Sequence, residues 1–189
     1  MPFNLPNLIT WSRILLIPFI VGIYYLPDAW ASIGVKNVTA TAIFIFAAIT
    51  DWLDGYLARS LNQMSAFGAF LDPVADKLMV AGALIVLLQL ERVESAVALI
   101  IIGREIAISA LREWMASLGK AKSVTVAFVG KIKTASQMIA LPLLLYHGEL
   151  LGINCQVLGT ILINVAAVLT VISMLYYLRR ALPHASAPG

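Results

Sequence analysis

The sequence has few charged residues and few cysteines or histidines. Only 12% of its 189 residues are charged, 61% are hydrophobic, and the mean hydropathy is +0.92. A soluble domain is typically about 45–50% apolar and about 25% charged, so these proportions exclude a soluble globule, a disordered chain and a collagen-like repeat. The lone Cys155 excludes an internal disulfide, and two histidines far apart in the chain do not suggest a zinc site. The sequence therefore predicts an all-α polytopic membrane protein.

Long apolar stretches account for most of the chain. A helix crosses a hydrocarbon core of about 30 Å with about 20 residues, and short connections make successive helices antiparallel neighbours. We therefore expect one domain over residues 1–189, with a short amphipathic segment at 1–10, six transmembrane helices and a flexible tail at about 181–189. The expected spans are roughly Trp11–Leu26, Val38–Arg59, Phe67–Leu90, Val93–Met115, Val124–Tyr146 and Leu151–Leu178.

The basic residues gather in the connections of one side. Cytoplasmic loops of membrane proteins collect Lys and Arg, so the net charge of +3 and the pI of about 9.1 do not call for a nucleic-acid partner, and we expect none. With the N- and C-termini both cytoplasmic, the outer side holds Lys36 and Arg92. The inner side then holds seven basic residues: Arg13, Arg59, Arg112, Lys120, Lys122, Arg179 and Arg180.

Four of the ten acidic residues fall within 26 positions. Asp51 and Asp54 share a helix face at a spacing of three, and Asp72 and Asp76 share one at a spacing of four. Both pairs are expected at the cytoplasmic side, where four carboxylates repel one another unless they are paired, hydrated or metal-bound. All-oxygen ligands suit Mg²⁺ or Mn²⁺, and two such ions form a clamp for displacement at phosphorus. The residues alone therefore indicate a two-metal site for a phosphate-containing substrate.

Structural explanations remain open for several of these residues. Asp72 precedes Pro73 and could cap a helix, and Asp51 and Asp54 could form ion pairs with Arg59. The small residues could serve a ligand or close helix packing, and the basic residues could be satisfied by other helices or lie in cytoplasmic loops. The small residues are Gly55, Ala58 and Gly68, and the basic residues are Arg104, Lys131 and Lys133.

The resemblance to a known family rests on one motif, Asp51-x2-Asp54-Gly55-x2-Ala58-Arg59-x8-Gly68-x3-Asp72-x3-Asp76. This spacing resembles the motif of the CDP-alcohol phosphotransferase family without departure. Segments 4–10, 104–106, 111–115 and 130–134 resemble its bacterial members that use sn-glycerol 3-phosphate, and the similarity extends to about Tyr177. It implies a six-helix protein, commonly a homodimer, in the bacterial cytoplasmic (inner) membrane, with its site open to the cytoplasm. The implied reaction transfers the phosphatidyl group of CDP-diacylglycerol to sn-glycerol 3-phosphate and releases CMP.

The resemblance also implies roles for individual residues. Two divalent cations, Mg²⁺ or Mn²⁺, would be held on the CDP pyrophosphate by Asp51, Asp54, Asp72 and Asp76, with Asp76 also the general base. CDP would be bound by Asn7, Thr10, Asp54, Gly55, Ala58, Arg59 and Gly68. The acceptor phosphate would be bound by Arg104, Arg112, Lys131 and Lys133.

Two alternatives to this function stay open. One is another transferase of the same family, forming an inositol phosphate lipid or cardiolipin. The other is a small cation or proton transporter, in which acids spread across the membrane depth and repeated halves are common. The acids of this chain cluster near one side and no internal repeat is visible.

Overall fold

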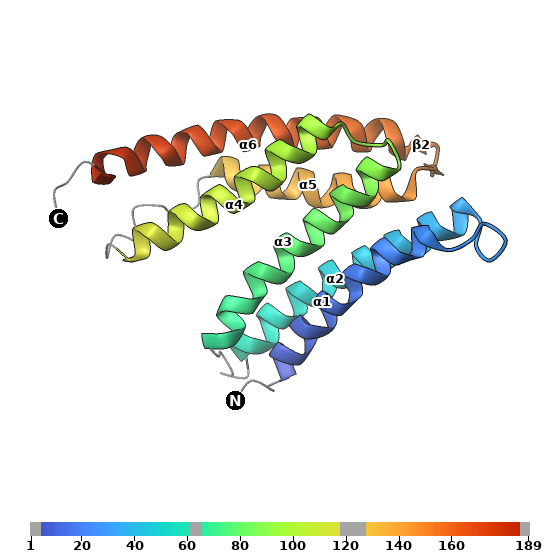
Figure 1. The fold of residues 1–189 in the computed structure, drawn as a ribbon, viewed down its shortest axis with the longest axis horizontal. Helices are drawn as coiled ribbons and strands as arrows, with labels where there is room; N and C mark the ends of the chain where they lie inside the picture. The colour runs from blue at the N-terminus through green and yellow to red at the C-terminus, as the bar shows by residue number, and fades with distance from the viewer. Residues whose placement is uncertain (1–4, 61–65, 118–127, 186–189) are drawn as a thin grey trace.

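The computed structural model describes residues 5–60, 66–117 and 128–185, and within these ranges it does not describe the side chains of 5–7, 52, 54–60, 66, 69, 128, 129 and 180–185. The described chain is almost entirely helical, which confirms the all-α prediction (Figure 1). Its long helices are α1 (Leu5–Gly22), α2 (Ile33–Ser60), α3 (Ala66–Gln89), α4 (Ser95–Ser117), α5 (Phe128–Tyr146) and α6 (Cys155–Ala185). The short elements are the 3-10 helix η1 (Ile23–Tyr25) and the strands β1 (Glu149–Leu150) and β2 (Ile153–Asn154).

Three helices in the described ranges are long and apolar enough to cross a membrane. Their qualifying segments are Leu8–Tyr25, Ile33–Asp51 and Cys155–Arg179. The helices α3, α4 and α5 have 24, 23 and 19 residues, so each also has about the length of a span. Charged residues inside these three helices lower their hydropathy, and four of those residues line the cavity described below: Asp76, Lys77, Glu105 and Lys133. The chain is accordingly a membrane protein.

The helices form two groups, which approach each other most closely at the right of Figure 1. In Figure 1, α1, α2 and α3 run side by side, whereas α4, α5 and α6 form a second group above them. We call the end where α1, α3 and α5 begin the left end, and the end where they finish the right end, as in the figure. Successive helices run in opposite directions, as the short connections predict.

The apolar core lies toward the right end. It includes Phe44, Leu84, Ile101, Leu141 and Ile163. Lipid tails are as apolar as these side chains, so in a membrane the core stabilises the fold through close packing. One such contact is at Gly159, where a Cβ atom would lie 2.8 Å from Cγ of Leu144. The missing side chain therefore lets α6 approach α5.

Two expected boundaries near α6 differ from the structure. Leu151 does not begin the last span, because residues 149–154 form an antiparallel hairpin and α6 begins at Cys155. Leu151 and Gly152 have φ of 53° and 78°, which is the positive φ that a two-residue type I′ turn requires at both central positions. The tail expected from about 181 is helical as far as Ala185.

Candidate active site

A cavity of about 320 Å³ lies between the two groups of helices. Its lining contains ionisable side chains from four helices: Asp51 of α2, Asp76 and Lys77 of α3, Glu105 of α4 and Lys133 of α5. Ionisable groups inside membrane helices are costly, and they usually mark a functional site where they pair or meet water. This charged cavity is therefore the candidate active site.

Arg13 of α1 joins the acids of α2 and α3. Its Nη1 donates hydrogen bonds to Oδ1 of Asp51 at 2.5 Å and to Oδ1 of Asp76 at 2.8 Å. The Arg13 side chain is fully buried, whereas the side chains of Asp51 and Asp76 are 41% and 49% exposed. One buried cation thus holds two carboxylates that remain accessible from the charged cavity.

The sequence reasoning missed this position of Arg13. It counted Arg13 among the cytoplasmic basic residues, but the side chain points into the protein and contacts two of the motif acids. The available signal was an arginine within an apolar stretch, three residues after Thr10 and hence on the same helix face.

Thr10 of α1 contacts a third motif acid. Its Oγ1 donates a hydrogen bond of 2.7 Å to Oδ1 of Asp72. The alternative that Asp72 caps a helix is wrong, because α3 begins at Ala66 and both Asp72 and Pro73 lie inside it. One face of α1 therefore positions acids from both neighbouring helices.

An ion pair between α4 and α5 forms the opposite wall. Nζ of the buried Lys133 donates a hydrogen bond to Oε1 of Glu105, and Nη1 of Arg104 lies 3.4 Å from the same oxygen. Of the four residues predicted to bind the acceptor phosphate, Lys133 is the one in the described lining. Glu105, which the sequence reasoning did not assign to the site, holds the ammonium group of Lys133 at the cavity wall.

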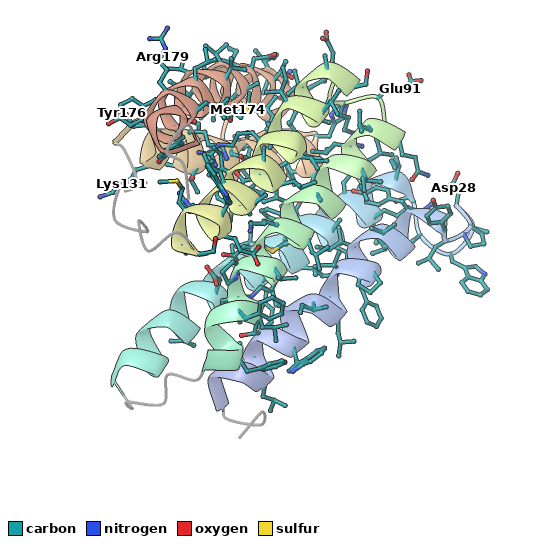
Figure 2. The ribbon with its side chains drawn as sticks, turned by 60° about the vertical axis from the view of Figure 1, so that its left-hand side comes forward. Asp28, Glu91, Lys131, Met174, Tyr176 and Arg179 are labelled. Carbon is teal, nitrogen blue, oxygen red and sulfur yellow. The ribbon has the colours of Figure 1, made fainter. Side chains whose placement is uncertain are left out.

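The other three predicted phosphate ligands lie outside this lining. Arg104 donates a hydrogen bond to Oγ of Ser173 at 3.3 Å, and the guanidinium carbons of Arg104 and Arg112 lie 5.8 and 5.9 Å from the ring centre of Tyr177. Both distances are those of cation–π contacts with α6. Lys131 is exposed and projects away from the bundle in Figure 2. Their assignment to the acceptor phosphate stays a prediction.

Part of the predicted CDP site lies outside the described side chains. This applies to Asn7, Asp54, Gly55, Ala58 and Arg59, whereas Gly68 is described and buried in the first turn of α3. Their roles stay predictions.

The described acids offer a metal ion a pair of carboxylates and no larger ligand group. Among the side chains that the structure describes, no three Asp, Glu, His or Cys residues form a group that could hold a metal ion. The side chain of Asp54 lies outside the described ones, so this finding does not include it. The accessible pair Asp51 and Asp76 nevertheless fits Mg²⁺, because proteins usually bind this ion through one or two carboxylates together with substrate phosphates.

Comparison with known proteins agrees with the motif. The sequence model of the CDP-alcohol phosphatidyltransferase family matches residues 3–172. A protein of Salmonella choleraesuis (strain SC-B67) is 51% identical over 185 residues, and one of Escherichia coli (strain K12) is 50% identical over 185 residues. Each alignment covers 96% of this chain and 96% of the relative, and both relatives are named CDP-diacylglycerol–glycerol-3-phosphate 3-phosphatidyltransferase. Because the match spans nearly the whole chain, this protein belongs to the CDP-alcohol phosphatidyltransferase family.

Proposed function

We propose that this chain transfers the phosphatidyl group of CDP-diacylglycerol to sn-glycerol 3-phosphate and releases CMP. The observation that carries the proposal is the identity of about half of all residues, over 96% of the chain, with relatives named for this reaction. The charged cavity supports it, since accessible carboxylates on one wall face a lysine ammonium on the other. Such a cavity suits two anionic substrates, one held through metal and the other through a basic side chain.

In this proposal all six helices cross the bacterial cytoplasmic membrane, with both termini and the left end in the cytoplasm. The exposed Lys131 and Arg179 lie at the left side of Figure 2, and the acidic Asp28 and Glu91 lie at the right. This distribution follows the positive-inside rule.

The basic residues at the right end are engaged within the protein. Nζ of the buried Lys36 donates hydrogen bonds to Oδ1 of Asp28 at 2.8 Å and to the carbonyl of Leu26. Nη1 of Arg92 donates to the carbonyls of Leu144 and Leu145, in the last turn of α5. Both right-end cations therefore serve contacts within the fold, whereas Lys131 and Arg179 at the left end are exposed. The exposed positive charge thus favours the left end, in agreement with the proposed orientation.

The chemistry would depend on the acids of α2 and α3. The family generally depends on a divalent metal, and Asp51, Asp54, Asp72 and Asp76 would hold Mg²⁺ or Mn²⁺ here. The bound metal would stabilise negative charge on the pyrophosphate. Asp76 would accept the proton of the 1-hydroxyl of sn-glycerol 3-phosphate while the hydroxyl oxygen attacks the β-phosphorus and CMP leaves. Arg13 would keep Asp76 in place during this transfer.

The acceptor phosphate would be bound on the opposite wall. Lys133 offers a compact charge there, and Glu105 keeps its ammonium oriented.

The active assembly would be a homodimer, as the resemblance implies.

Assaying purified protein with CDP-diacylglycerol, Mg²⁺ and a panel of alcohols tests the proposal. We expect CMP release with sn-glycerol 3-phosphate and none after chelation of divalent metal. Release only with inositol phosphate or phosphatidylglycerol would replace the acceptor but keep the family. Cation flux into liposomes without any CMP release would favour a transporter.

Replacing Lys133 with alanine should raise the Michaelis constant for sn-glycerol 3-phosphate much more than that for the lipid donor. The expected rise is on the order of tenfold to a hundredfold, because a hydrogen bond between charged groups is lost. Steady-state CMP release at varied concentrations of each substrate measures both constants. The same assay on Lys131→Ala and Arg112→Ala tests the two exposed candidates. Equal rises in both constants for Lys133→Ala would contradict an acceptor-phosphate role.

A further inference from the structure

Gln137 of α5 is an uncharged polar residue in the lining of the charged cavity. It is only 3% exposed, and its Oε1 has no hydrogen-bond partner among the residues that the structure describes. A buried polar atom without a partner is costly, and native proteins retain few of them. Such an atom in the wall of a substrate cavity is therefore a candidate for contact with the substrate.

The polar side chains beside Gln137 are engaged within the protein. Oγ1 of Thr134 donates a hydrogen bond of 2.9 Å to the carbonyl of Gly130, one turn earlier in α5. Oε1 of Glu105 accepts a hydrogen bond from Nζ of Lys133. By contrast, no described residue donates to Oε1 of Gln137. On this wall, the carboxamide of Gln137 thus has an acceptor that the fold itself does not use.

Gln137 lies one helical turn from Lys133, to which the proposed function assigns the acceptor phosphate. Residues four apart share a helix face and are separated by about 6 Å along its axis. Both side chains are buried, and both line the charged cavity. Asp76, the proposed base for the 1-hydroxyl of the acceptor, lines the same cavity from α3. An acceptor that reaches from Lys133 to Asp76 therefore lies beside the face of α5 that carries Gln137.

The acceptor has one hydroxyl that the proposed reaction leaves unused. sn-Glycerol 3-phosphate carries its phosphate on C3 and attacks through the oxygen on C1, so the hydroxyl on C2 lies between the two. Inside the cavity this hydroxyl loses its contacts with water and needs another hydrogen-bond partner. A carboxamide suits it, because the amide oxygen accepts and the amide nitrogen donates. Unlike a carboxylate, a carboxamide also adds no negative charge beside an anionic acceptor.

We propose that the carboxamide of Gln137 hydrogen-bonds the 2-hydroxyl of the acceptor and selects alcohols that carry a hydroxyl at this position. The inference rests on the proposed function, because it takes the acceptor phosphate to be at Lys133 and the 1-hydroxyl at Asp76. A site built to bond a hydroxyl rejects an analogue without it, since the polar group of the site is then left unpaired. Gln137 thus provides specificity for the alcohol, whereas Lys133 binds a phosphate that many other molecules share.

Comparing two acceptors tests this inference. The analogue 3-hydroxypropyl phosphate keeps the phosphate and the reacting hydroxyl but lacks the 2-hydroxyl. We expect the wild-type protein to prefer sn-glycerol 3-phosphate by about tenfold to a hundredfold in kcat/KM, the range for a buried polar group left unpaired. Gln137→Met removes both polar atoms at similar length and should reduce this preference to about threefold or less, by lowering kcat/KM for sn-glycerol 3-phosphate. A substitution that only loosened the packing would lower both values equally and leave the preference unchanged.

The matched control is Gln156→Met, since Gln156 is exposed on α6 and lies outside the lining of the charged cavity. It should leave the preference unchanged. If Gln137→Met does not fold, Gln137→Asn takes its place, because its shorter side chain withdraws the amide from the hydroxyl and should narrow the preference as well. A folded variant of either kind with an unchanged preference, or a wild-type protein without one, would overturn the inference. Failure of the proposed function would appear separately, as no CMP release with sn-glycerol 3-phosphate by the wild-type protein.

Discussion

Replacing Arg13 with alanine should reduce kcat by on the order of a hundredfold or more and should also lower the melting temperature. The substitution removes the fully buried cation that holds Asp51 and Asp76 from two helices. Breaking a buried ion pair typically costs about 3–5 kcal/mol, and the effect on folding should be smaller here because both carboxylates are about half exposed. The fall in kcat should be large even if the loss of stability is moderate, because Arg13 would no longer hold the carboxylates of Asp51 and Asp76 in a fixed position relative to each other. CMP release and thermal unfolding in detergent measure the two effects.

Three further variants separate positioning from simple stabilisation. Arg13→Lys retains the charge and should recover part of kcat. Adding Asp51→Asn to Arg13→Ala should restore part of the melting temperature, because it removes one of the two repelling carboxylates, but it should not restore kcat. Arg179→Ala, at an exposed position of α6, is the matched control and should change neither quantity. A folded Arg13→Ala protein with nearly normal kcat would show that the bridge does not position the acids.

Asp76→Asn should nearly abolish turnover while it spares most of the binding of the CDP-lipid. Asparagine keeps the shape of the side chain and can still accept the hydrogen bond from Arg13, but it cannot take a proton from the acceptor hydroxyl. General-base catalysis typically contributes about 10²- to 10⁴-fold, so we expect kcat to fall within or beyond that range. CMP release gives kcat, and protection of the folded protein by CDP-diacylglycerol against thermal unfolding reports binding.

The control for this substitution is Glu149→Gln, which makes the same acid-to-amide change on the exposed strand β1. It should retain normal turnover. If Asp76→Asn also retained turnover, another group would have to accept the proton. If it lost protection by the lipid as completely as it lost turnover, Asp76 would be required for binding the donor.

The sequence alone predicted the helical membrane class, the acidic motif and the family. Local properties determine all three, because hydropathy depends on composition and the motif depends on spacing along the chain. The same reasoning placed Asp51 and Asp76 in one site, and both line the charged cavity. It could not show that Asp72 lies within α3, because the dipeptide Asp72-Pro73 also fits a helix start.

Only the tertiary structure decided which charges meet. Arg13 reaches Asp76 across 63 positions and Lys133 reaches Glu105 across 28, and no local pattern encodes either contact. Arg104 was grouped with the phosphate ligands because of its charge, yet it packs against Ser173 and Tyr177 of α6. The physical reason is that composition and spacing determine that a helix carries a charge, whereas the packing of its neighbours determines what that charge contacts. In this protein, packing brings the acids and Arg13 to one wall of the cavity and Lys133 to the other.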